Sequence, residues 1–88
     1  MSQVVLYGRP GCHLCEDARV LLERVRAELP FELIERDIER DQELLRRFLE
    51  RIPVVTLNGE ELFELFVDEQ ALRAHLVADF DDLESSER

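Results

Sequence analysis

A strand, a helix and a second strand follow one another within the first 38 residues, and this unit constrains the fold more than any other feature. Residues 3–7 are rich in valine, as a buried strand is. Over residues 14–29, apolar side chains recur every three or four positions, which predicts a helix with one buried stripe. Residues 31–38 alternate imperfectly, and we predict a strand there. So short a connection pairs the two strands in parallel with a right-handed crossover.

A second helix and a hairpin are predicted next. Asp41 is typical of an N-cap, and apolar residues at helical spacing follow it as far as residue 51. Residues 53–57 are β-branched and strand-like, and residues 62–67 supply the return strand. The Asn-Gly dipeptide at 58–59 favours a type I′ turn between them, because both residue types tolerate a positive φ. These two strands are therefore antiparallel.

A last helix completes the predicted order β-α-β-α-β-β-α, an α/β class with one four-stranded mixed sheet flanked by three helices. Asp68 is its predicted N-cap. Its predicted buried stripe comprises Ala71, Leu72, His75, Leu76 and Phe80. We assign residues 1–80 to a single domain and residues 81–88 to an acidic, frayed tail.

The charge balance excludes several classes of partner. Eleven basic residues stand against 21 acidic ones, a formal net charge of −10 over 88 residues. Such a chain is repelled by phosphate backbones and anionic membranes, so we expect neither a nucleic-acid nor a membrane partner. The longest apolar run, residues 4–7, is too short for a membrane span and lacks the flanks of a signal peptide. Two cysteines cannot form the disulfide framework of a small secreted domain, so a cytoplasmic location is expected.

Those two cysteines, Cys12 and Cys15, lie where the first strand is followed by the first helix. With Cys12 as the N-cap, free helix amides and the helix dipole lower its thiol pKa below the usual value of about 8.5. Arg9 adds to this effect, whereas Glu16 and Asp17 oppose it, so we predict a moderate depression.

The same spacing predicts a division of labour between the sulfurs. Cys15 points back toward the cap, which suits a disulfide and places one sulfur near solvent and the other beneath it. The exposed Cys12 thiolate then attacks a disulfide, and Cys15 resolves the mixed disulfide. His13, between them, either tunes the thiolate electrostatically or is simply a solvent-exposed residue.

These features resemble the short glutaredoxin-like family of thioredoxin-fold proteins over roughly residues 3 to 78. The residues that carry the resemblance are Arg9-Pro10-Gly11-Cys12-His13-Leu14-Cys15 after a strand and Ile52-Pro53 before a hairpin. It implies a thioredoxin fold in which Pro53 is cis and packs beside the cysteine pair. It also implies that the backbone of Ile52 pairs with the substrate chain as a short strand. The implied activity is thiol–disulfide exchange, with Cys12 and Cys15 as catalytic residues and Ile52, Pro53, Arg9 and Asp68 docking the substrate.

The chain departs from the glutaredoxin pattern at two places. Glutaredoxins have Pro-Tyr between the cysteines, where this chain has His13-Leu14. They also have a Gly-Gly pair before the acidic cap that holds glutathione, where this chain has Leu65-Phe66-Val67-Asp68. Asp68 still offers a carboxylate and free helix amides, but side chains at 65–67 make a close approach of glutathione to the backbone harder.

We therefore predict a monomeric oxidoreductase with no tightly bound cofactor and no metal, and with glutathione as a possible co-substrate. Its substrate is a disulfide-containing or glutathionylated protein, and glutathione or a reductase supplies the electrons. Two other interpretations stay open: a redox-sensitive binding module with little turnover, and an iron–sulfur or zinc carrier through the cysteine pair. Arg51 either receives a substrate carboxylate or ends its helix favourably against the dipole.

Overall fold

The computed structural model describes the backbone of residues 2–86 and the side chains of residues 2–80. Its elements are β1 (Gln3–Gly8), α1 (His13–Glu28), β2 (Glu32–Asp37), the 3₁₀ turn η1 (Ile38–Arg40), α2 (Gln42–Phe48), β3 (Val54–Leu57), β4 (Glu60–Glu64) and α3 (Glu69–Ser86). Apart from the short 3₁₀ turn, this is the order predicted from the sequence.

The four strands form one mixed sheet in the order β2-β1-β3-β4. β1 pairs in parallel with β2, and the two are connected by α1, as the short crossover required. β1 and β3 are antiparallel, as are β3 and β4. The predicted mixed sheet with three helices is therefore confirmed.

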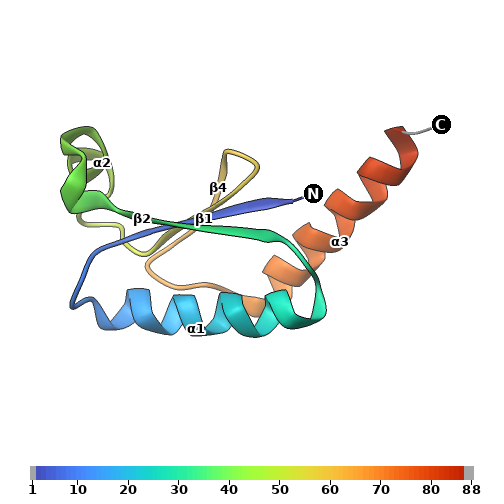
Figure 1. Ribbon diagram of the computed structural model, residues 1–88, viewed down its shortest axis with the longest axis horizontal. Coiled ribbons are helices and arrows are strands. Elements are labelled where there is room, and N and C mark those ends of the chain that lie inside the picture. The colour runs from blue at the N-terminus through green and yellow to red at the C-terminus, as the bar shows by residue number, and fades with distance from the viewer. Residues whose placement is uncertain (1, 87–88) are drawn as a thin grey trace.

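Helices cover both faces of this sheet, with α1 and α3 on one side and α2 on the other (Figure 1). Alternate residues of each central strand serve the two sides, as the period of a strand requires. The larger apolar cluster packs the first side and contains Val4, Leu6, Ala18, Leu22, Val25, Phe31, Val55, Leu57, Leu72 and Leu76. The smaller cluster joins Cys15 to the second side and contains Cys15, Ile38, Phe48, Ile52 and Val54. The cysteine pair thus lies at the end of the sheet where both layers meet.

Two aspartates begin their helices as predicted. One Asp41 carboxylate oxygen accepts hydrogen bonds from the amides of Glu43 (2.9 Å) and Leu44 (3.3 Å) at the start of α2. Asp68 accepts one from the amide of Ala71 (3.2 Å) at the start of α3. Each carboxylate satisfies amides that have no partner within the helix, which fixes where the helix starts.

The return strand of the hairpin lies earlier than the predicted residues 62–67. The tight turn pairs Leu57 with Glu60, so β4 begins directly after the turn and ends at Glu64. Leu65 then adopts a positive φ of 72° and leaves the strand. The short turn therefore makes β4 begin earlier than predicted, and the left-handed conformation of Leu65 makes it end earlier.

On α3, the predicted buried stripe is narrower than expected. Leu72 and Leu76 are fully buried, but His75 is exposed and Phe80 is 38% exposed. The prediction that His75 belongs to the buried stripe was wrong, because the buried side of α3 follows Leu72 and Leu76 and His75 lies outside it. The helix continues to Ser86, within the segment 81–88 that was predicted to fray, and Glu87 and Arg88 lie outside the described residues.

No helix within residues 2–86 combines the length and the apolar character that crossing a bilayer requires.

Candidate active site at the cysteine pair

Cys12 is the N-cap of α1, as the sequence predicted. Its backbone is extended (φ −90°, ψ 113°), and its sulfur accepts a hydrogen bond from the amide of Cys15 at 3.2 Å. The Cys12 carbonyl oxygen accepts the first helical bond from Glu16 at 3.1 Å. The two cysteines are joined by a disulfide across this first turn, with their Cα atoms 5.2 Å apart. The start of α1 therefore keeps the two sulfurs close together and directs the Cys15 amide toward the sulfur of Cys12.

The two sulfurs differ in their surroundings. Cys15 is only 7% exposed and belongs to the apolar cluster with Phe48 and Ile52. Cys12 is partly buried and packs against the outside of the same cluster. Cys12 is thus partly accessible from outside, whereas Cys15 is buried.

Gly8, at the end of β1, makes room for Cys15. A Cβ atom at this position would lie 2.9 Å from the Cys15 sulfur and 3.1 Å from the Cys15 Cβ. Any side chain at residue 8 would therefore push Cys15 out of place. Sequence reasoning missed this role of Gly8, because nothing in the local sequence pattern distinguishes the glycine.

The residues before β3 form an edge beside the pair. The Ile52–Pro53 peptide bond is cis, as the family resemblance implied, and both residues are buried. The amide of Leu65 donates to the carbonyl oxygens of Arg51 (3.0 Å) and Pro53 (2.9 Å). Among the described residues, no hydrogen bond involves the backbone of Ile52, which lies between them. The Ile52 backbone is therefore flanked by two bonded carbonyl groups and has no hydrogen-bond partner of its own among the described residues.

The other predicted site residues lie farther out. Arg9 is exposed and its guanidinium is 3.9 Å from Glu39. It lines a hollow of about 340 Å³ that also reaches Cys15. Asp68 is exposed at the start of α3, and His13 is exposed on the first turn of α1. The structure thus brings Cys12, Cys15 and Ile52 into one cluster, with Pro53 next to Ile52 in sequence, and the roles of all the predicted site residues stay predictions.

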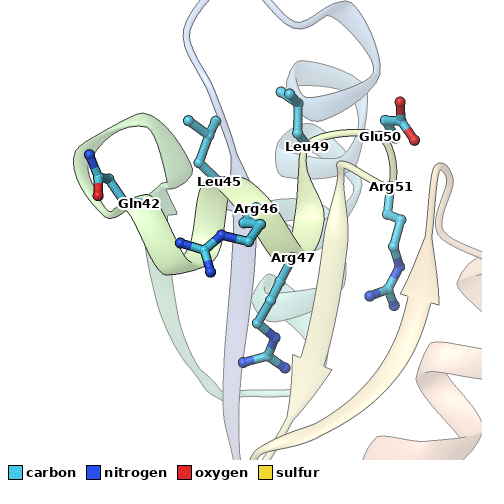
Figure 2. A pocket seen from close by; sticks show the side chains of 7 residues that line it. All are labelled: Gln42, Leu45, Arg46, Arg47, Leu49, Glu50 and Arg51. Atoms are coloured by element: carbon cyan, nitrogen blue, oxygen red, sulfur yellow. The ribbon is translucent and has the colours of Figure 1, made fainter.

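A larger hollow, of about 560 Å³, lies on α2 and the turn that follows it. Figure 2 shows Leu45 and Leu49 pointing to one side and Arg47 and Arg51 to the other. These two guanidinium groups lie over the ring of Phe48, with their carbons 4.8 and 5.3 Å from its centroid.

Carboxylates of β4 neutralise the same two arginines. Arg51 donates to Glu64 at 2.5 Å and to Glu61, and Arg47 is 3.7 Å from Glu61. The hydrogen bond to Glu64, followed by that to Glu61, raises the pKa of Arg51. Because α2 ends at Phe48, the interpretation of Arg51 as the end of its helix was wrong. The Arg51 cation is instead paired within the chain with Glu64 and Glu61, partners that sequence reasoning missed.

A metal site requires several ligating side chains that lie close together. Within residues 2–80, no three side chains of His, Cys, Asp or Glu come together as ligands of a metal ion.

The sequence matches the family described as "Glutaredoxin-like domain (DUF836)" over residues 3–77. The chain belongs to this glutaredoxin-like family. An uncharacterized protein of Mycobacterium tuberculosis is 34% identical over 79 residues, which cover 84% of this chain and 81% of that protein. An uncharacterized protein of Mycobacterium bovis matches to the same extent.

Solved structures agree with this assignment. A protein of Nitrosomonas europaea is 33% identical, with a TM-score of 0.75 over 84% of this chain and 89% of that chain. A protein of X. campestris, also 33% identical, has a TM-score of 0.71 over 85% and 96%. A thioredoxin mutant from Halobacterium salinarum is 20% identical, with a TM-score of 0.65 over 88% and 73%. This last likeness shows that the glutaredoxin-like chain has the thioredoxin fold, as the sequence predicted.

The glutaredoxin-like protein has a second surface that sequence reasoning missed. Leu65 and Phe66 had been interpreted as part of the return strand, but both follow β4 and are exposed. Together with Val67 they border a groove against Leu14, the residue next to Cys15 on α1. The available signal was the run of apolar side chains at positions where glutaredoxins have glycine.

Proposed function

We propose that this glutaredoxin-like protein is a thiol–disulfide oxidoreductase in which Cys12 is the nucleophile and Cys15 the resolving thiol. The observation that carries this proposal is the asymmetry of the pair. Cys12 caps α1, accepts the Cys15 amide and is partly accessible, whereas Cys15 is 7% exposed. A helix N-terminus stabilises a thiolate, and the thiolate is the form that attacks a disulfide.

The reaction balances as two successive exchanges. In the reduced protein, the Cys12 thiolate attacks one sulfur of a substrate disulfide, and the other substrate sulfur leaves as a thiolate that takes up a proton. Cys15 then loses its proton and attacks the Cys12 sulfur of the mixed disulfide, which releases the second substrate thiol. The substrate gains two electrons and two protons, and the protein ends in the Cys12–Cys15 disulfide form. Two molecules of glutathione, or a dithiol reductase, return the pair to the reduced form.

Substrate docking at Ile52 fits the hydrogen bonds around it. The Leu65 amide satisfies the carbonyls of Arg51 and Pro53. The backbone of Ile52 between them has no hydrogen-bond partner among the described residues, which supports pairing with an extended substrate segment. Ile52 belongs to the same cluster as Cys15, so a segment paired there lies beside the disulfide. Pro53, Arg9 and Asp68 complete the proposed docking region. We propose that the protein acts as a monomer in the cytoplasm, where glutathione and reductases are available to recharge the pair.

Reduction of a small glutathione mixed disulfide, with glutathione and its reductase as electron source, tests the proposal. Wild type, Cys12→Ser and Cys15→Ser are compared. We expect Cys12→Ser to be inactive. We expect Cys15→Ser, which lacks the resolving thiol, to accumulate mixed disulfides when a disulfide-containing protein is supplied. Turnover by Cys12→Ser at the wild-type rate would refute the assignment. Inactivity of the wild type in this assay, together with turnover when a dithiol reductase replaces glutathione, would identify the reductase as the electron donor. Inactivity with both donors would refute turnover and favour the redox-sensitive binding module.

A further inference from the structure

Exposed apolar side chains gather in a groove between the first turns of α1 and the segment after β4. Leu14, the residue just before Cys15, is 50% exposed, and Leu65 and Phe66 are 44% and 73% exposed. The groove holds about 140 Å³ between the first part of α1 and the segment after β4. Its lining residues are Leu14, Asp17, Ala18 and Leu21 of α1 and residues 65–67.

The groove is small, and its lining residue Leu14 is the sequence neighbour of Cys15. Pockets that enclose whole ligands hold about 300 Å³ or more, so this groove accommodates about one side chain of a larger partner. Leu14 lies between the two cysteines in sequence, and Leu65 hydrogen-bonds the residues on either side of Ile52. A chain that pairs with Ile52 therefore passes beside the groove.

The charge around the groove is negative. Asp17 lines it and Asp68 follows Val67, and both carboxylates are exposed. Among the side chains of residues 2–80, neither aspartate has a cation within 4 Å, whereas Glu16, next to Asp17 in sequence, is paired with Arg19 at 2.8 Å. The rim therefore attracts a cation, and this agrees with the net charge of −10.

We propose that this groove selects the substrates of the proposed oxidoreductase. The preferred partner is a protein segment with an apolar side chain close to its disulfide cysteine and a Lys or Arg next to that side chain. The apolar side chain enters the groove against Leu14 and Phe66, and the cation lies near Asp17. Glutathione carries a net negative charge and no apolar side chain, so it lacks both features. This inference rests on the proposed function and specifies its substrate class.

Three peptides test the selection, and the second and third each differ from the first by one residue. Each peptide carries one cysteine, which forms a mixed disulfide with thionitrobenzoate. Beside this cysteine, the first peptide has Phe and Lys, the second has Phe and Glu, and the third has Ser and Lys. Attack of the reduced protein's Cys12 thiolate on the peptide sulfur releases coloured thionitrobenzoate, so the rate of the first exchange is measured without an electron donor. Rates are divided by those with dithiothreitol, which removes the intrinsic reactivity of each peptide.

We expect the Phe-Lys peptide to react about tenfold faster than the Ser-Lys peptide, since burial of one apolar side chain is favourable. It should react about threefold faster than the Phe-Glu peptide, and this second preference should fall at 1 M salt. Phe66→Ser should remove the preference for Phe, and Asp17→Asn the preference for Lys. Val20→Ser is the matched control, because Val20 is 54% exposed on α1 outside the groove, and it should keep both preferences.

The outcomes separate the two proposals. Equal normalised rates for all three peptides, with release that depends on Cys12, would overturn the groove and leave the oxidoreductase standing. Retention of both preferences by Phe66→Ser and Asp17→Asn would likewise overturn the groove and leave the oxidoreductase standing. Release that is unchanged in Cys12→Ser would overturn the oxidoreductase and the groove together. A preference for Phe that depends on protein concentration through dimer formation would show that a second copy fills the groove, and would also overturn the selection.

Discussion

The backbone of Gly8 passes so close to Cys15 that a methyl group on Gly8 would lie 2.9 Å from the Cys15 sulfur. The end of β1 therefore packs directly against the side chain of Cys15, the buried cysteine of the pair. Cys15 must stay within reach of Cys12 for the disulfide to form. The position of the Gly8 backbone therefore affects the proposed chemistry as well as the packing.

Replacement of Gly8 by alanine should destabilise the fold by about 1–3 kcal/mol, because the added methyl group over-packs a buried site. Urea unfolding of the oxidised and reduced protein measures this. The matched comparison is Gly8→Ala in a Cys15→Ala background, where the sulfur is gone and the cost should be smaller. An equal cost in both backgrounds would place the collision elsewhere than at the sulfur.

Alkylation of the reduced protein should distinguish the two thiols. In Cys15→Ser, iodoacetamide should modify Cys12 with a midpoint below pH about 8.5, since the helix amides favour its thiolate. In Cys12→Ser, the buried Cys15 should react more slowly at every pH. A Cys12 midpoint at or above that of a free thiol would contradict the N-cap argument.

Most of the fold could be predicted because its signals are local. The hydrophobic spacing of α1, the Asn-Gly turn and the capping aspartates Asp41 and Asp68 each act within a few residues, and each was confirmed. The position of Cys12 at a helix start could be predicted for the same reason.

The features that were missed depend on contacts between distant segments. Leucine rarely adopts a positive φ, so no sequence rule places Leu65 outside the strand. Its amide meets the carbonyls of Arg51 and Pro53 only after β3 and β4 have paired. Helical spacing likewise placed His75 beside Leu72, but how much of α3 is covered depends on its packing against the rest of the domain.

Loss of the α2 cap should weaken the layer over Cys15. Asp41→Ala removes the acceptor of two amides and should cost about 1 kcal/mol. Because α2 carries Phe48 against Cys15, the loss should register in global urea unfolding. Gln42→Ala, at the next exposed position, is the control and should cost much less. Equal effects of the two substitutions would mean that the carboxylate cap does not stabilise α2.

The ion pair between Arg24 of α1 and Glu69 of α3 should make the free energy of unfolding depend on pH. Glu69, at the start of α3, accepts hydrogen bonds from Arg24 of α1 (2.5 Å) and from Arg73 (3.1 Å). These bonds, that from Arg24 first, lower the pKa of Glu69 below its ordinary value of 4.5. A carboxyl group with a lower pKa in the folded state stabilises the fold above its unfolded pKa, and this contribution disappears as pH falls through the folded value.

Wild type should therefore be more stable than Glu69→Gln at pH 7, and the difference in the free energy of unfolding should shrink steadily as the pH falls below 4.5. Urea unfolding at a series of pH values between 7 and 2 measures the difference. Glu32→Gln removes the same charge from an exposed residue that forms no ion pair among the described side chains, so its effect should lack this pH dependence. A difference for Glu69→Gln that stays constant down to pH 2, or the same trend in Glu32→Gln, would show that the ion pairs of Glu69 do not hold α1 and α3 together.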